Sequence, residues 1–286
     1  MVMPNKFLLS LSLMRLQNPT GYLLVFFSAC FGTLLNNIAI YSLLKLLFLF
    51  FIGSIITRGA GSVLNDIFDK DFDKHVLRTK NRPLANGALN VSDAMILLTI
   101  LSIISLTILL SLNKTAICLG FFSFILIVLY PLMKRITFFP QIFLGLTFNA
   151  VLIGNSAVTD KISIEAVIMY IACCFWTIGY DTIYGFMDIE DDKKINVKSM
   201  PILLEKKNYK LHLYVYYTVF IILFIVANII ATHHLNYIAI LCAYMMLIWQ
   251  VVTLEISEPQ NCLIRFKNNN YVGLILVLGS LDLTIV

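Results

Sequence analysis

Charge is scarce in this chain, and its scarcity narrows the class of protein at once. Only 13% of the 286 residues are charged, whereas 59% are hydrophobic, and the mean hydropathy is +0.88. A soluble domain carries about 25% charged residues. Here apolar runs recur along the whole length, and they are continuous, as in Ile96–Leu112, rather than alternating as in a transmembrane strand. The sequence therefore predicts an all-α, polytopic membrane protein.

Motifs based on cysteine are also missing, as are processing signals. The six cysteines include no Cys-x-x-Cys pair, and most lie in apolar runs, where cysteine is usually a small buried hydrophobe. We expect neither a disulfide framework nor a structural zinc site. No Ala-x-Ala cleavage site follows the first apolar run, and the beginning of the chain is not rich in Arg and Ser. We therefore expect an uncleaved first helix in a bacterial inner (plasma) membrane, with the mitochondrial inner membrane as the alternative.

The apolar runs and the basic residues together predict a topology. Only Lys45, Lys114 and Lys161 lie on one side of the expected spans, and all other lysines and arginines lie on the other side, which the positive-inside rule makes cytoplasmic. The net charge of +5 follows from this topology and does not indicate a nucleic-acid partner. We expect a single domain, 1–286, with repeat-like halves of about 1–135 and 136–286. The sequence predicts about nine spans, each near the ~20 residues that a bilayer requires: residues 20–41, 43–64, 92–112, 115–133, 138–158, 163–185, 210–231, 235–255 and 270–286.

Carboxylates gather in two clusters, each at the end of an expected span and on the same side. In each cluster the spacing places three of them on one face of a helix: Asp66, Asp69 and Asp73, then Asp181, Asp188 and Asp192. Basic residues follow both: Arg78, Lys80 and Arg82, then Lys193, Lys194 and Lys198. Mg²⁺ binds through one or two carboxylates plus substrate phosphate oxygens, and nearby cations neutralise further phosphate charge. The pattern predicts a metal–diphosphate site; the alternative is two solvated, charge-balanced loops.

A diphosphate site of this kind suits prenyl chemistry. Diphosphate leaves an allylic carbon once metal ions take up its charge, and the resulting carbocation must be kept from water. Aromatic faces stabilise such a cation. Trp176, Tyr180 and Tyr184 are spaced i, i+4, i+8 and approach the second acidic cluster; the alternative for these rings is ordinary packing or an interfacial belt. The residues favour an intramembrane enzyme over a cation-coupled transporter, whose carboxylates usually lie near the midplane.

These motifs resemble the UbiA-type intramembrane aromatic prenyltransferases, in particular the branch that uses 4-hydroxybenzoate. The similarity covers nearly the whole chain and is carried by these segments: Pro19-x-Gly21, Arg58-x-x-Gly61, Asn65-Asp66-x-x-Asp69-x-x-x-Asp73, Arg78-Thr79-x-Asn81-Arg82-Pro83, Tyr130-Pro131-x-x-Lys134-Arg135, Tyr180-Asp181-Thr182-x-Tyr184 and Asn268-Asn269-Asn270-Tyr271. The chain departs from the pattern at Ser28, Asn149-Ala150 and Asn196. These departures bear on the length of the prenyl chain rather than on the reaction class.

The resemblance implies roles for individual residues. Those implied as metal ligands are Asn65, Asp66, Asp69, Asp73, Asp188 and Asp192. Those implied as catalytic are Asp69, Asp73, Asp188, Asp192 and Arg135, the arginine contacting either diphosphate or the aromatic carboxylate. Those expected to bind substrate are Arg58, Asn65, Arg78, Arg82, Lys134, Tyr180, Asp181, Tyr184, Lys194 and Lys198; for the basic residues the alternative is a topological role.

The resemblance also implies the reaction. We expect about nine helices around a central cavity, capped by two Asp-rich cytoplasmic loops. The enzyme would use Mg²⁺ to transfer a polyprenyl group from polyprenyl diphosphate to the carbon ortho to the hydroxyl of 4-hydroxybenzoate, in ubiquinone biosynthesis. Dihydroxynaphthoate, homogentisate or haem are the alternative acceptors. Beyond these substrates and membrane lipid, no nucleic acid and no obligate protein partner is implied.

Overall fold

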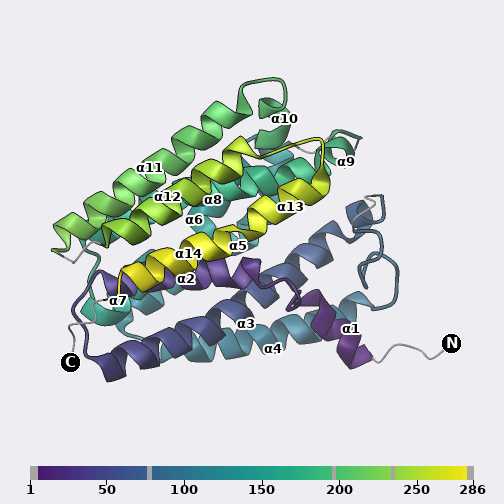
Figure 1. The fold of residues 1–286 in the computed structure, drawn as a ribbon. Helices are drawn as coiled ribbons and strands as arrows, with labels where there is room; N and C mark the ends of the chain where they lie inside the picture. Colours follow the sequence, from purple (N-terminus) through teal and green to yellow (C-terminus); the bar gives the residue numbers. More distant parts are fainter. Residues whose placement is uncertain (1–5, 76–78, 195–197, 233–235, 282–286) are drawn as a thin grey trace.

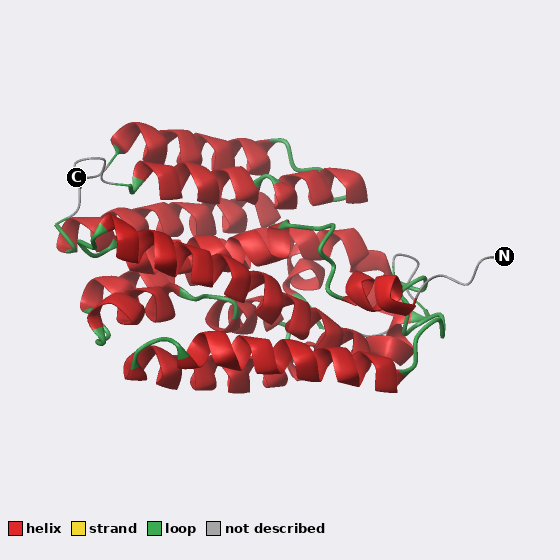
Figure 2. Ribbon diagram, turned by 90° about the horizontal axis from the view of Figure 1, so that it is seen from below, coloured by secondary structure: helices red, strands yellow, loops and turns green. Residues whose placement is uncertain are grey.

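The all-α expectation is confirmed. The computed structural model describes residues 6–75, 79–194, 198–232 and 236–281, and within these ranges the regular structure consists of helices alone (Figure 2). The helices of the N-terminal half are α1 (Lys6–Leu13), α2 (Thr20–Leu34), α3 (Ile40–Asp73), α4 (Val91–Leu110) and α5 (Lys114–Ile136). The second half contains α6 (Pro140–Thr147), α7 (Val151–Thr159), α8 (Ile164–Gly185), η1 (Phe186–Asp188), α9 (Ile189–Lys194), α10 (Met200–Leu204), α11 (Tyr209–Ile230), α12 (Tyr237–Val252), α13 (Pro259–Lys267) and α14 (Asn269–Gly279).

The protein is an integral membrane protein. Among the described residues, five helical segments have the length and apolar composition to cross a bilayer, and three shorter apolar helices accompany them. The number of spans, expected to be nine, stays a prediction. Two segments differ from their expected bounds. First, α3 continues to Asp73 instead of ending near residue 64, because residues 62–73 include no proline or glycine to interrupt it. Second, the last helical segment begins at Pro259, well before residue 270.

The helices pack side by side as a ring (Figure 1). Following direct contacts around it, α3 packs on α2, α2 on α14, α14 on α12, α12 on α11, and α11 on α8. From α8 the ring continues through α6 and α5 to α4, which packs on α3. The ends of α3 and α8 that carry the acidic clusters lie at the same end of the bundle (Figure 1). The fold thus brings together two clusters that are about a hundred residues apart in the sequence.

Close backbone approach between α2 and α7 determines one side of the ring. Gly32 of α2 faces the carbonyl of Val151, and Gly154 of α7 faces the carbonyl of Ala29; a Cβ at either glycine would clash with that carbonyl oxygen. The hydroxyl of Thr33 lies 3.3 Å from the carbonyl oxygen of Gly154. Small residues allow membrane helices to approach this closely, and interhelical hydrogen bonds then add to their association.

This contact yields a stability prediction. The change Gly154→Ala forces the two backbones apart, and we expect it to cost about 1–3 kcal/mol and to lower the Tm by about 3 °C or more. The measurement is thermal unfolding of the purified protein in detergent. Gly53→Ala is the matched control, because a Cβ there meets only Ile108, at 3.7 Å. An equal Tm shift in both variants would contradict the role given to the α2–α7 contact.

Candidate functional site

The first acidic cluster occupies the last turns of α3, on a continuous helix as its spacing predicted. Asp66 and Asp73 are buried, with exposed fractions of 2% and 7%. Arg82, from the loop after α3, donates to Asp66 at 3.1 Å and to Asp73 at 2.7 Å. Asn65 donates its amide to Asp69 at 2.8 Å. A carboxylate removed from water requires partners of this kind, so Arg82 is an integral part of the cluster.

Arg15 also pairs with Asp66, a contact that the sequence did not predict. The residue lies between α1 and α2 and has a positive φ of 55°, a backbone conformation that is uncommon for residues other than glycine. Sequence reasoning treated Arg15 only as a topological marker, because its partner is 51 residues away along the chain. The one available signal was its position just before the Pro19-x-Gly21 segment.

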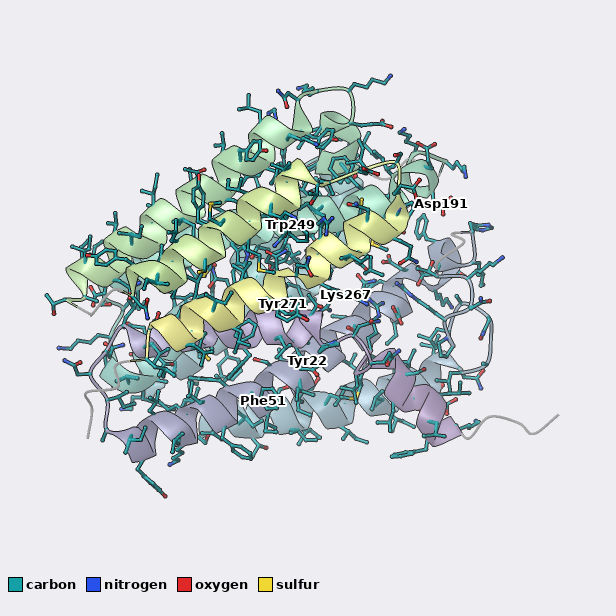
Figure 3. All side chains as sticks on the ribbon, in the orientation of Figure 1. Tyr22, Phe51, Asp191, Trp249, Lys267 and Tyr271 are labelled. Carbon is teal, nitrogen blue, oxygen red and sulfur yellow. The ribbon has the colours of Figure 1, made fainter. Side chains whose placement is uncertain are left out.

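The second acidic cluster is less regular. Asp181 is on α8, Asp188 ends the 3₁₀ turn η1, and Asp192 is on α9, so the three do not follow one continuous helix as the spacing suggested. Asp191 pairs with Lys194 at 3.1 Å and lies where α9 protrudes from the bundle (Figure 3). Lys194 is exposed, and Lys198 lies over the ring of Phe138, 5.6 Å from its centroid.

A cavity of about 610 Å³ lies between the two clusters. Its lining includes Asp66 from the first cluster and Asp181 from the second, together with the cations Arg15, Arg58, Arg82 and Lys267. Asp69, Asp73, Asp188 and Asp192 are not among its lining residues. Since four cationic and two acidic side chains line it, the cavity favours an anion.

Arg58 projects into this cavity from the middle of α3. It donates to Ser62 at 3.1 Å, and its guanidinium lies 5.1 Å from the centroid of the Phe148 ring. Gly21 leaves room for it, because a Cβ there would stand 2.8 Å from its Nε. Arginine over an aromatic face retains donors for an anion, so Arg58 is available to a ligand in the cavity.

Two of the three aromatic side chains expected at the site reach the cavity. Tyr180 and Tyr184 line it, and both pack on Phe266, with centroid distances of 5.9 Å and 4.6 Å. Trp176 does not line it; it is buried and stacks on Phe220. The interpretation of the three as one stripe was therefore wrong for Trp176, because a step of four residues turns a helix by about 40° and two steps by about 80°.

Trp176 instead supports the wall from behind. Its indole N–H donates to Asn269 at 2.7 Å, and the Asn269 amide donates to Gln250 at 3.0 Å. The ring meets Tyr180 edge-on, with an interplanar angle of 90°. A buried asparagine at the junction of α13 and α14 thus positions a residue of the cavity wall through one intervening side chain. The Asn268-Asn269-Asn270 segment was noted in the sequence without this role.

Some predicted residues lie beyond what the structure describes. Arg78 falls in the gap between residues 75 and 79. For Lys134 and Arg135 the structure describes the backbone, on the last turn of α5, but not the side chains. Their functional roles stay predictions.

The donor chemistry of the site fits Mg²⁺. Carboxylate and amide oxygens are the ligands of a hard cation, and Asn65, Asp66 and Asp69 provide them within about one turn of α3. Among the described residues, no three His, Cys, Asp or Glu side chains form a metal-binding group. Mg²⁺ at a phosphate site needs no such cage, since it takes one or two carboxylates and completes its shell with water and substrate oxygens.

The departures at Ser28 and Asn149-Ala150 lie next to each other. The backbone N–H of Ala150 donates to the hydroxyl of Ser28 at 2.9 Å, and the Asn149 amide donates to the carbonyl of Tyr170 at 2.7 Å. These contacts close the break between α6 and α7. Asn149 and Ala150 also line a second cavity of about 130 Å³, which shares Arg58 with the larger one. Residues at these two positions therefore shape space next to the site.

Comparisons with known proteins agree with this geometry. Residues 22–272 match the UbiA prenyltransferase family. The chain is 32% identical over 272 residues to a 4-hydroxybenzoate octaprenyltransferase of Coxiella burnetii, covering 95% of this chain and 94% of that one. It is 39% identical over 273 residues to a mitochondrial 4-hydroxybenzoate polyprenyltransferase of Aedes aegypti, covering 93% of this chain and 61% of that one.

Solved structures with the same fold include two archaeal relatives. A UbiA homolog from Aeropyrum pernix K1 superposes with a TM-score of 0.76 at 25% identity, over 90% of this chain and 96% of that chain. A UbiA homolog from Archaeoglobus fulgidus bound to GPP and Mg²⁺ superposes with a TM-score of 0.65 at 17% identity, over 95% of this chain and 98% of that chain. The second likeness is one of fold alone.

The shared role of Arg82 can be tested directly. Arg82→Met leaves Asp73 without its cation and Asp66 with one fewer, and we expect it to cost about 2 kcal/mol or more of folding free energy. Thermal unfolding in detergent measures this change. Arg82→Lys should lose less, and Lys80→Met, an exposed cation in the same loop, should be neutral. Equal stability of the Met variant and the parent would show that the pairing is dispensable.

Proposed function

Because this chain belongs to the UbiA prenyltransferase family, we propose that it transfers a polyprenyl group from polyprenyl diphosphate to 4-hydroxybenzoate in ubiquinone biosynthesis. The bond forms at the ring carbon ortho to the hydroxyl, and diphosphate is released. Relatives named for this reaction align over more than nine-tenths of the chain. The observation that carries the proposal is the cation-rich cavity between the acid-bearing ends of α3 and α8.

Arginines that line the cavity are suited to the diphosphate of the donor. Arg58 and Arg82 offer planar, permanently charged groups that match phosphate oxygens. Arg82 also holds Asp66 and Asp73, so it couples the position of the carboxylates to that of the diphosphate. Arg135 is a further candidate, for the diphosphate or for the carboxylate of the acceptor. Lys134, Lys194 and Lys198 remain weaker candidates, since the latter two lie outside the cavity lining.

The metal sites follow the same division. Mg²⁺ would be held by Asn65, Asp66, Asp69 and Asp73 on one side and by Asp188 and Asp192 on the other. When bound, it takes up the charge that develops on the leaving diphosphate. The carboxylates of α3 are kept within reach of the cavity by Arg15 and Arg82.

The aromatic wall suits the second half of the reaction. Tyr180, Tyr184 and Phe148 line the cavity, so their faces can stabilise an allylic cation and exclude water from it. The phenol oxygen of 4-hydroxybenzoate donates electron density to its ortho carbon, which forms the new C–C bond as the C–O bond to diphosphate breaks. The ring then loses a proton. We place the active site at the cytoplasmic face of a bacterial inner membrane, following the distribution of basic residues.

Product analysis tests the acceptor. Purified protein in lipid vesicles is given a mixture of prenyl diphosphates with 4-hydroxybenzoate, dihydroxynaphthoate, homogentisate or haem. We expect only 4-hydroxybenzoate to gain prenyl mass by mass spectrometry, since its carboxylate and hydroxyl suit a cation-rich site. The longest product reports the chain length that the cavities admit. Prenylation of another acceptor with none of 4-hydroxybenzoate would sink the proposal.

Substitution and chelation test the metal roles. We expect Asp69→Asn and Asp188→Asn each to lower turnover about 100-fold or more, as for loss of a group that stabilises developing charge. EDTA should abolish product in the parent, and added Mg²⁺ should restore it. The matched controls are Asp71→Asn and Glu190→Gln, which remove exposed carboxylates paired only with nearby lysines. Full turnover of both Asp69→Asn and Asp188→Asn would refute these ligand assignments.

A further inference from the structure

Lys267 lines the large cavity, yet none of the roles above requires it. It is the last residue of α13, whose sequence Pro-Gln-Asn-Cys-Leu-Ile-Arg-Phe-Lys is polar, and it precedes α14, whose sequence becomes continuously apolar from Tyr271 to Leu278. A transition of this kind along one helical segment marks the boundary between hydrocarbon and headgroups. Lys267 is therefore at the level of the bilayer where lipid phosphates lie.

Aromatic residues near Lys267 agree with that level. Tyr271, on the first turn of α14, is 59% exposed, and Tyr22 of α2 lines the same cavity as Lys267. Figure 3 shows Lys267 and Tyr271 along the α13–α14 segment, on the side of the molecule where Tyr22 and Phe51 also lie. Tyrosines are enriched where helices cross the membrane–water interface. The cavity thus reaches the flank of the bundle at headgroup depth.

The lower edge of this opening is closed by a polar contact. Asn270 donates its amide to the hydroxyl of Thr20 at 3.0 Å, and below this point α2 and α14 pack directly on each other. Above it, the lining passes from Gly21 and Tyr22 to Phe266 and Lys267 without such a bridge. We call this region, lined by Gly21, Tyr22, Phe266 and Lys267, the lateral mouth.

Lys267 differs from the other cations of the cavity. Arg15 and Arg82 are paired with carboxylates, and Arg58 donates to Ser62. Lys267 is exposed, and no carboxylate of the described residues forms an ion pair with it. A lysine is a compact, strongly hydrated charge with three donors on a flexible stem. Such a group suits transient capture of an anion better than permanent coordination.

A simple anchoring role accounts for less. An interfacial lysine that only fixes a helix in the membrane extends toward water, as Lys45 is free to do on the exposed surface of α3. Arg265, two residues before Lys267, stacks on Trp249 at 4.1 Å and does not line the cavity. Lys267 combines headgroup depth with direct access to the cavity.

We propose that Lys267 captures the diphosphate head of the polyprenyl donor as it moves from the bilayer through the lateral mouth into the cavity. This inference rests on the proposed function. The tail remains in the bilayer during capture, beside the exposed apolar side chains of α14, Tyr271, Leu274 and Leu278. From Lys267 the head passes inward to Arg58 and Arg82. A donor small enough to arrive from water has no need of this lysine.

The test compares two donors in vesicles of phosphatidylcholine. One is a long-chain polyprenyl diphosphate dissolved in the bilayer, and the other is dimethylallyl diphosphate dissolved in the water. For Lys267→Met we expect the KM of the long donor to rise about tenfold, the loss of one charge-assisted contact. The kcat and the KM of the short donor should stay within about twofold of the parent, a difference too small to represent a lost contact. Lys267→Arg should restore the long-donor KM, and Lys45→Met, the matched control, should change neither.

Three results would overturn the inference: an equal KM rise for both donors, no rise for the long donor, or a fall in kcat alone. The shared phosphate chemistry also admits a phospholipid headgroup as the occupant. If the effect of Lys267→Met disappears when phosphatidylglycerol is added to vesicles, or arises only then, the lysine binds lipid and the inference fails. Binding of a non-reactive long-chain prenyl thiodiphosphate, followed by tryptophan fluorescence, requires no acceptor. It separates failure of this inference from failure of the proposed reaction.

Discussion

Two arginines neutralise the buried acidic end of α3, and the site depends on that pairing. A buried carboxylate left without a partner costs several kcal/mol. Arg82 meets this requirement for Asp66 and Asp73 from the loop after α3, and Arg15 meets it for Asp66 from the segment before α2. The pairing therefore ties three separate segments around one cavity. Arginine binds carboxylate and phosphate with the same planar donors, so groups that hold the carboxylates are also placed to meet a diphosphate.

Asparagines close the two helix breaks that give the cavity its shape. In an apolar surrounding, each interrupted helix leaves backbone groups that need partners. Asn149 provides them between α6 and α7, where it donates to Tyr170 and accepts from Val151. Asn269 lies at the start of α14 and accepts from the carbonyl-rich junction's neighbour Trp176 while donating toward α12 and α13. The first break brings Phe148 against Arg58, and the second leaves Lys267 at the lateral mouth. Side chains that serve the site thus come from places where regular structure ends.

Composition and spacing predicted much of this arrangement, and the misses have physical reasons. Apolar content alone indicated a helical membrane protein, and the i, i+3, i+7 spacing placed Asp66, Asp69 and Asp73 on a helix because α3 does continue through them. The length of α3 was underestimated, since acidic residues after an apolar run resemble a loop. Arg15 was missed because an ion pair across 51 residues leaves no local pattern. The lateral mouth could not be predicted either, since it depends on how α2 and α13 pack.

The charge imbalance of the cavity suggests how two substrates divide the space. Four cations and two carboxylates line it, and like charges in a low dielectric repel one another strongly. An anion relieves that repulsion in proportion to its charge, so a diphosphate gains more from the same field than a singly charged aromatic carboxylate. The diphosphate therefore takes the inner position beside Arg58 and Arg82. The acceptor ring is left the aromatic wall of Tyr180 and Tyr184, where the prenyl carbon must also lie. Electrostatics alone thus places the carbon that loses diphosphate next to the ring that attacks it.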